Sequence, residues 1–260
     1  MIDLLKSRLL AIAVFAMGLI QTAAAVPTTI IDNYVGSDSN GYGDVIGSTD
    51  NFQISGMDVA LSGSMLSVSI FTNFAGKGDD GLFTSLTAGA GIGYGDLFLG
   101  SSWTPFGSSP YDADGNSNGT HWTYGFALDN RWWNGTDASG GSGTLYQLNG
   151  ATNADNALLS EEFLTGGVFR NGQEVAVDTN GQTAVGSGSW SVIDGTSINF
   201  TLDLSATDLL NGNEIALHWG FTCANDVIEG AFSVPEPGML VLLASGLLGI
   251  GLRYRPSQAG

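Results

Sequence analysis

The chain has 260 residues, with 25 acidic and 7 basic side chains and a formal net charge of −18. A surface this negative repels nucleic acids and anionic lipids and attracts cations, so we exclude a nucleic-acid partner. Glycine supplies 39 residues, about twice its usual share. Cys223 is the single cysteine of the sequence, which rules out an intrachain disulfide.

Residues 1–25 have the three regions of a secretory signal peptide. Lys6 and Arg8 precede an apolar run at 9–20, and small residues follow at 23–25. This order predicts cleavage after Ala25, at a site formed by Ala23 and Ala25. A retained N-terminal membrane helix is the alternative, but a run of about 12 apolar residues is short for a bilayer core.

Residues 26–233 carry the pattern of one all-β domain. Apolar and polar side chains alternate in four segments, at 66–70, 122–128, 198–204 and 215–223. A period of two places alternate residues on opposite faces of a strand, so each segment predicts a strand with one core-facing side. Many short strands separated by turn residues favour a single antiparallel β-sandwich of the jelly-roll or lectin type. A closed barrel is the alternative fold.

A run of oxygen-bearing side chains precedes the strand predicted at 122–128. Asp112, Asp114, Asn116 and Asn118 stand at alternate positions, and from Asp114 the sequence matches the first half of a calcium-binding loop. Gly125 occupies the position of the bidentate glutamate, which excludes a complete EF-hand. Two interpretations stay open: a calcium site, and a polar turn whose residues suit the backbone conformation.

Two adjacent tryptophans, Trp132 and Trp133, follow the same predicted strand. In an extended segment their side chains point to opposite faces, so one indole would be exposed and able to stack on a sugar ring. The alternative is that one indole closes the edge of the core and the other packs beneath a loop. The pair is therefore a candidate carbohydrate-binding site.

Asn-Gly pairs at 171–172 and 180–181 separate short extended segments. Because Asn-Gly readily adopts positive φ, the two pairs predict two hairpins and thus a three-stranded meander. Helical signals are sparse in the sequence. One short helix is expected within 156–164, and another begins at Ser205, which would cap it ahead of Leu209.

The sequence carries no catalytic motif that we recognise. A nucleophile elbow and an H-E-x-x-H zinc motif are both absent, and the two histidines, His121 and His218, are far apart. Both fall on the non-core phase of a predicted strand, where a solvated or second-layer histidine is the simpler interpretation. Cys223 is expected to be a buried thiol. We predict that the protein is not an enzyme.

Residues 234–260 form a three-part tail. A proline-flanked acid comes first, an uncharged stretch at 238–252 follows, and a basic end comes next. The uncharged stretch nearly spans a bilayer core, and the arginines can reach the cytoplasmic lipid headgroups. An ordinary C-terminal membrane helix is the alternative. The residues that mark the tail are Val234, Pro235, Glu236, Pro237, Arg253 and Arg255.

This tail resembles the PEP-CTERM sorting signal of Gram-negative bacteria, which an exosortase recognises and cuts. The resemblance implies a precursor in the inner membrane, processed by signal peptidase and exosortase, and a mature form at the cell surface or outside the cell. We expect a structural or interaction role, with extracellular polysaccharide as a candidate partner. Two alternatives remain open: a carbohydrate-binding module ordered by calcium, and a glycan hydrolase whose paired carboxylates the sequence does not reveal.

Overall fold

The computed structural model describes residues 27–38, 41–78, 91–132, 140–164 and 166–234. The predicted signal peptide and every tail residue after Val234 lie outside these ranges. Among the helices within these ranges, none has both the length and the apolar character needed to cross a membrane.

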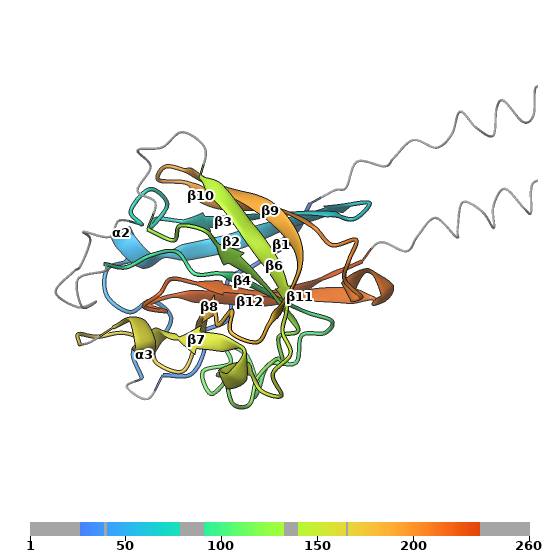
Figure 1. Ribbon diagram of the computed structural model, residues 1–260. Helices are drawn as coiled ribbons and strands as arrows, with labels where there is room; N and C mark the ends of the chain where they lie inside the picture. The colour runs from blue at the N-terminus through green and yellow to red at the C-terminus, as the bar shows by residue number, and fades with distance from the viewer. Residues whose placement is uncertain (1–26, 39–40, 79–90, 133–139, 165, 235–260) are drawn as a thin grey trace, which may run out of the picture.

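One antiparallel sheet of ten strands forms the body of the protein (Figure 1). Its strand order is β1-β2-β3-β10-β9-β6-β5-β4-β11-β12. The strands are β1 (Thr28–Ile30), β2 (Ile54–Ser62), β3 (Met65–Thr72), β4 (Leu97–Gly100), β5 (Tyr124–Leu128), β6 (Gly141–Gln147), β9 (Thr183–Ile193), β10 (Ser197–Asp203), β11 (Glu214–Gly220) and β12 (Val227–Ser233). The predicted antiparallel all-β class is confirmed.

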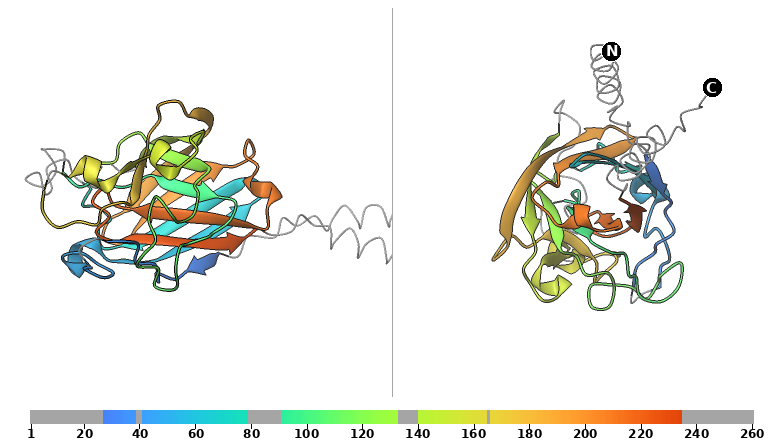
Figure 2. Two further views of the ribbon diagram at one scale, coloured as in Figure 1. Left: turned by 90° about the horizontal axis from the view of Figure 1, so that it is seen from below. Right: turned by 90° about the vertical axis from the view of Figure 1, so that its right-hand side faces the viewer.

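The sheet curls until its first and last strands meet. The right-hand view of Figure 2 shows the strands around a nearly closed ring, and β1 contacts β12 directly. Ile30 packs so closely on Gly230 that a Cβ atom at Gly230 would lie 2.5 Å from Ile30 Cγ2. We call this contact between β1 and β12 the seam. A single curled sheet therefore encloses the core that a sandwich would hold between two separate sheets.

The concave side of this sheet encloses the main hydrophobic core. Phe126 and Phe200 pack there edge to face, with ring centres 6.2 Å apart. Trp219 is fully buried in the same core, and so is Cys223, as the sequence predicted. Removal of apolar surface from water, worth about 25 cal/mol per Å², is the main force that holds the sheet in this curled form.

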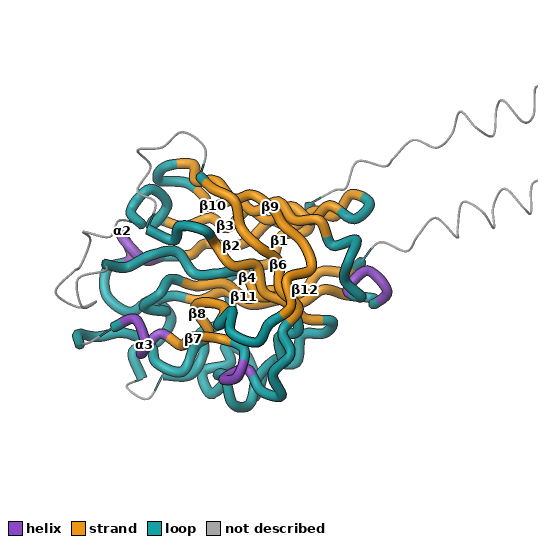
Figure 3. The backbone as a smooth tube through the Cα atoms, viewed as in Figure 1, coloured by secondary structure: helices purple, strands orange, loops and turns teal. Residues whose placement is uncertain are grey.

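A second, two-stranded sheet covers part of the outer face. It consists of β7 (Ala157–Leu159) and β8 (Glu174–Val177). Val177 of β8 packs in one hydrophobic cluster with Phe98 of β4 and with Trp122, which lies just before β5. Strand β11 is therefore buried on both faces, whereas β3 alternates between buried and more exposed positions. Figure 3 shows loops gathered around this second layer, with α3 beside β7.

The predicted three-stranded meander is wrong. Gly172 and Gly181 do adopt positive φ, of 73° and 76°. However, β8 pairs with β7, while β9 pairs with β6 and β10, so the strands on either side of Gly181 belong to different sheets. The turn residues set the local backbone geometry, but the position of β8 over the outer face sets its partner.

The helices are shorter than predicted. They are α2 (Thr49–Phe52), α3 (Ser160–Phe163) and the 3-10 turns η1 (Asn153–Asp155) and η2 (Leu209–Asn211). Segment 156–164 divides into β7 and α3 because the backbone of its first half pairs with β8. The second predicted helix shrinks to η2, which follows Asp208 instead of starting at Ser205.

Candidate functional site

Three carboxylates from separate loop positions meet near the ends of the seam strands. Asp32 follows β1, Asp44 lies in the loop before α2, and Asp226 directly precedes β12. One carboxylate oxygen from each residue lies within 4.8 Å of the others. We call these three residues the acid cluster.

The three carboxylates of the acid cluster differ in their surroundings. Asp226 is fully buried, and it accepts hydrogen bonds from the N–H groups of Ile54, at 2.6 Å, and Val227, at 2.9 Å. Both carboxylate oxygens of Asp32 are buried, and neither has a hydrogen-bond partner of normal geometry, although the backbone of Tyr34 lies near enough to act on its pKa. Asp44 is exposed. Asp226 is thus fixed by backbone hydrogen bonds, Asp32 is buried without such bonds, and Asp44 is accessible to solvent.

Burial raises the pKa of each acid in the cluster, and repulsion from a neighbouring carboxylate adds to the rise for Asp32 and Asp226. Burial raises the pKa of Asp32 strongly, the charge of Asp44 adds to the rise, and the backbone of Tyr34 opposes it. Burial also raises the pKa of Asp226 strongly, with Asp32 adding to the effect. The pKa of Asp44 rises through burial despite the nearby charge of Arg170. Carboxylates this close are unfavourable together unless protons or a cation neutralise them.

A buried arginine ties together the loops that carry the cluster. The Arg170 side chain is fully buried, and its guanidinium donates to the carbonyls of Gly36 at 3.0 Å and Ala224 at 3.2 Å. It also donates to the carbonyls of Gly43 and Asp44, each at 2.6 Å. Each of the three acids is therefore on, or within a few residues of, a backbone segment held by this one side chain. Five donors in a rigid fork suit arginine to such a role.

A second polar group lies buried between the large sheet and β8. His218 Nδ1 is 2.9 Å from Glu229 Oε1, and His218 Nε2 is 2.6 Å from the backbone oxygen of Glu174. Since both neighbours are acceptors, a protonated imidazole satisfies both. Trp103 Nε1 donates to the other oxygen of Glu229 at 3.0 Å. His218 is 0% exposed, so it is a second-layer histidine that solvent does not reach.

The four predicted calcium ligands lie in one turn: Asp112, Asp114, Asn116 and Asn118. Asp114 is buried, and its two oxygens accept from the Tyr34 hydroxyl and the Phe106 N–H, each at 2.9 Å. Asn118 Oδ1 accepts from the Gly115 N–H at 3.0 Å, which closes the turn on itself. These are the hydrogen bonds that a polar turn makes without a metal ion. Calcium binding at this turn stays a prediction.

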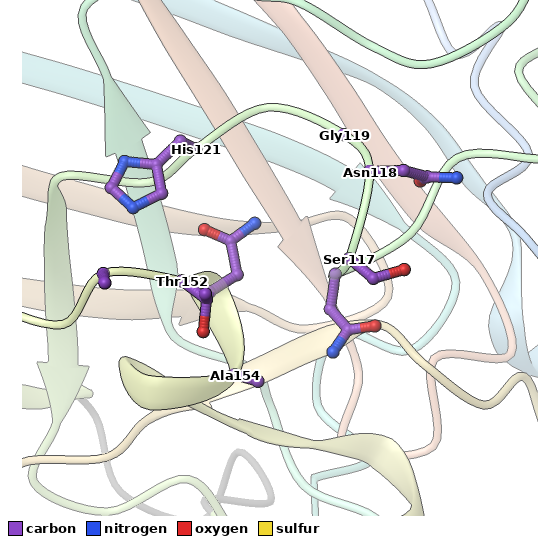
Figure 4. Close-up of a pocket in the computed structure, with 9 residues that line it drawn as sticks. Ser117, Asn118, Gly119, His121, Thr152 and Ala154 are labelled. Atoms are coloured by element: carbon purple, nitrogen blue, oxygen red, sulfur yellow. The ribbon is translucent and has the colours of Figure 1, made fainter.

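An open hollow of about 530 Å³ lies beside this turn (Figure 4). The His121 side chain at this hollow is exposed. The Asn153 side chain is fixed by two hydrogen bonds: it accepts from the Trp122 N–H at 3.0 Å and donates to the Thr120 carbonyl at 2.8 Å. The lining includes amide, hydroxyl and imidazole side chains and no carboxylate. It consists of Asn116, Ser117, Asn118, Gly119, His121, Ala151, Thr152, Asn153 and Ala154.

Of the two candidate sugar-stacking residues, the structure describes Trp132. It is half-buried, and its indole nitrogen is buried without a hydrogen-bond partner. The guanidinium carbon of Arg131 lies 6.0 Å from its ring centre, while Arg131 also pairs with Asp96 at 3.1 Å. The covered part of the indole reduces the surface left for a sugar. Trp133 lies outside the described residues.

Sequence reasoning missed the acid cluster and Arg170. Asp226 is far from Asp32 and Asp44 in the chain, and the three aspartates show no metal-ligand spacing. The one available signal was weak: a basic residue is rare between positions 26 and 234, where only Lys77, Arg131 and Arg170 occur. In a domain this acidic, either of its two arginines is a natural candidate for a buried counter-charge.

The described chain ends at the first residue of the predicted processing signal. Val234 directly follows β12, and its N–H donates to the Asn213 carbonyl at 2.9 Å. The remaining processing residues lie outside the described ranges: Ala23, Ala25, Pro235, Glu236, Pro237, Arg253 and Arg255.

The comparison with protein families identifies this tail. The family of the PEP-CTERM protein-sorting motif matches residues 233–255, which include the proline-flanked acid, the uncharged stretch and both arginines. No curated protein and no solved structure matches the chain. The motif implies export and processing by an exosortase. The chain therefore carries a PEP-CTERM sorting signal at residues 233–255.

Proposed function

We propose that this exported protein serves outside the inner membrane as a non-catalytic structural or interaction domain, released or attached after an exosortase has cut its tail. The mature form then resides at the cell surface or in the extracellular matrix. Its partners during maturation are signal peptidase and exosortase.

The observation that carries this proposal is the junction between the domain and the sorting motif. The motif begins at Ser233, the last residue of β12, and that residue still pairs with Glu214 of β11. Val234 makes one more backbone hydrogen bond, to Asn213. A cut after this point removes the tail and leaves each strand of the described sheet intact, as delivery of a finished domain requires.

The placement of the titratable groups supports a non-catalytic role. The polar group around His218 is at most 3% exposed at each of its residues, which are His218, Glu174 and Glu229. A polymeric substrate therefore has no access to it. In the acid cluster Asp226 is fully buried and both oxygens of Asp32 are buried, so only Asp44 is open to a substrate. Neither group has the geometry of an exposed acid–base pair.

Carbohydrate binding is the second candidate function, and the hollow of Figure 4 favours it. Its amide, hydroxyl and imidazole side chains can hydrogen-bond sugar hydroxyls, and no carboxylate there repels an acidic polysaccharide. Binding of purified extracellular polysaccharide should then weaken in His121→Ala and persist in Trp132→Ala. Equal loss in both variants would point to the tryptophan instead of the hollow, and no binding by the unaltered protein would remove this candidate.

The main proposal is tested by replacing the motif's acid. In the native host, Glu236→Ala should accumulate as uncut precursor in the membrane fraction, because the exosortase is expected to read that carboxylate. The control is Asp112→Ala, an exposed acid outside the motif, which should be cut and exported normally. Normal processing of Glu236→Ala protein would overturn the assignment of the tail as an exosortase substrate.

A further inference from the structure

We propose that Asp32, Asp44 and Asp226 bind a calcium ion that holds the seam of the curled sheet together. The proposal concerns a site in the folded domain and does not depend on how the tail is processed. It also differs from the turn at 112–118, where the sequence suggested calcium.

The arrangement of the three carboxylates suits a single ion. Their oxygens lie within 4.8 Å of one another. Two ligands on opposite sides of one calcium ion are about 4.6–5.2 Å apart, because each calcium–oxygen distance is about 2.3–2.6 Å. One ion can therefore touch all three carboxylates with little movement of the backbone.

Asp32 gives independent support, since its carboxylate lacks a partner. Each of its oxygens exposes less than 1 Å² to solvent, and neither has a hydrogen-bond partner of normal geometry. The backbone of Tyr34 offsets only part of the rise in its pKa that burial causes. Buried polar groups in folded proteins are almost always partnered, so an orphaned carboxylate that faces two others indicates a missing cationic ligand. Asp226, by comparison, is already held by the amides of Ile54 and Val227 and would be a fixed point of the site.

Calcium is the cation that this site fits best. Three carboxylates make a hard, all-oxygen donor set, which favours magnesium, calcium or manganese over zinc or copper. The donors come from three irregular loop positions, and calcium accepts irregular coordination whereas magnesium demands an octahedron. Extracellular calcium modules bind with Kd of about 10⁻⁴–10⁻³ M, a range that an exported acidic domain can use.

The position of the site gives the ion a structural task. Asp32 lies two residues beyond Ile30 of β1, and Asp226 immediately precedes Val227 of β12. Asp226 also binds the first amide of β2, through Ile54. An ion there would join the two strands that meet at the seam, while Arg170 holds the surrounding loops from the other side through their carbonyls.

The test uses the exported protein, freed of metal with a chelator, in calorimetric titrations and thermal melts. Calcium should bind with Kd near the millimolar range or tighter and raise Tm more than magnesium at the same concentration. In Asp32→Asn the calcium affinity should fall at least about tenfold. Metal-free Asp32→Asn should be no less stable than the metal-free unaltered protein, because the substitution removes one of three carboxylates that repel one another. Asp44→Asn, at an exposed position, should show the same loss of affinity.

The matched control is Asp114→Asn, in the turn that the sequence favoured. Its calcium affinity should match that of the unaltered protein. A calcium response that survives in Asp32→Asn and Asp44→Asn, or that disappears in Asp114→Asn alone, would overturn the proposal. Equal effects of calcium and magnesium on the unaltered protein would do the same, since they would reduce the response to screening of the acidic surface.

Discussion

His218 of β11 and Glu229 of β12 are direct cross-strand partners, and their side chains meet in a buried pair with Nδ1 2.9 Å from Oε1. Burial alone would lower the pKa of His218. The hydrogen bond and charge of Glu229, together with the charge and carbonyl of Glu174, outweigh burial and raise that pKa above its ordinary value. The pair therefore links the stability of the second layer to pH.

We predict that His218→Gln destabilises the protein by about 3–5 kcal/mol at pH 6, because it leaves Glu229 buried without its counter-charge. Folded His218 keeps its proton at pH values where the unfolded chain has lost it, so this stabilisation is present below about pH 6.5 and is lost as pH rises through the folded pKa. Denaturant unfolding at pH 6 and pH 9 should show a smaller difference between variant and unaltered protein at pH 9.

His218→Gln must be compared with the unaltered protein at each pH, because the titration of other buried acids also lowers stability as pH rises. Burial raises the pKa of Glu174 to about 7 and that of Asp114 to about 6, so stability declines between pH 4 and pH 7 in both proteins. A destabilisation by His218→Gln that is the same at pH 6 and at pH 9 would contradict a protonated histidine in the folded state.

The seam predicts a second effect. In Gly230→Ala the added methyl group would lie 2.5 Å from Ile30 Cγ2, a branched side chain with little freedom to move. We expect a loss of about 1–3 kcal/mol in the free energy of unfolding, as for other overpacked positions. Gly166→Ala is the control, because a Cβ atom there meets nothing within 4 Å. Equal stabilities of the two variants would mean that β1 and β12 do not press together in solution.

Asp114 predicts a third effect, independent of metal. Its side chain accepts from the Tyr34 hydroxyl and the Phe106 N–H, so Asp114→Ala leaves two donors without their acceptor. We expect a loss of about 1–3 kcal/mol, equal in calcium and in chelator. Asp112→Ala, at an exposed neighbour, should change stability by less than about 0.5 kcal/mol. A loss seen in calcium but absent in chelator would restore the turn as a metal site.

The alternation of side chains predicted strands such as β11 correctly, but it could not say what covers each face. His218 falls on the polar phase of β11, yet it is fully buried because β8 lies over that face. Turn residues likewise predicted the local backbone conformation but not the strand pairing. Gly181 adopts the expected positive φ, yet the strand before it, β8, pairs with β7, and the strand after it, β9, pairs with β6.

The acid cluster could not be predicted because the seam creates it. Asp32 and Asp226 stand near opposite ends of the domain sequence, and they meet since the ten strands curl until β1 reaches β12. No spacing rule joins residues this far apart. The sorting tail was predictable for the opposite reason: its signal is contiguous, from Pro235 to Arg255, and does not depend on the fold.

The central claim is that the chain is an exported precursor trimmed at both ends, and intact-mass measurement of the protein recovered from outside the inner membrane of its host tests this most directly. We predict a chain that begins at Val26 and ends within residues 235–237, with any attached group adding a defined mass. A recovered protein that still contains residues 238–260 would contradict exosortase processing, and one that retains residues 1–25 would contradict the signal peptide.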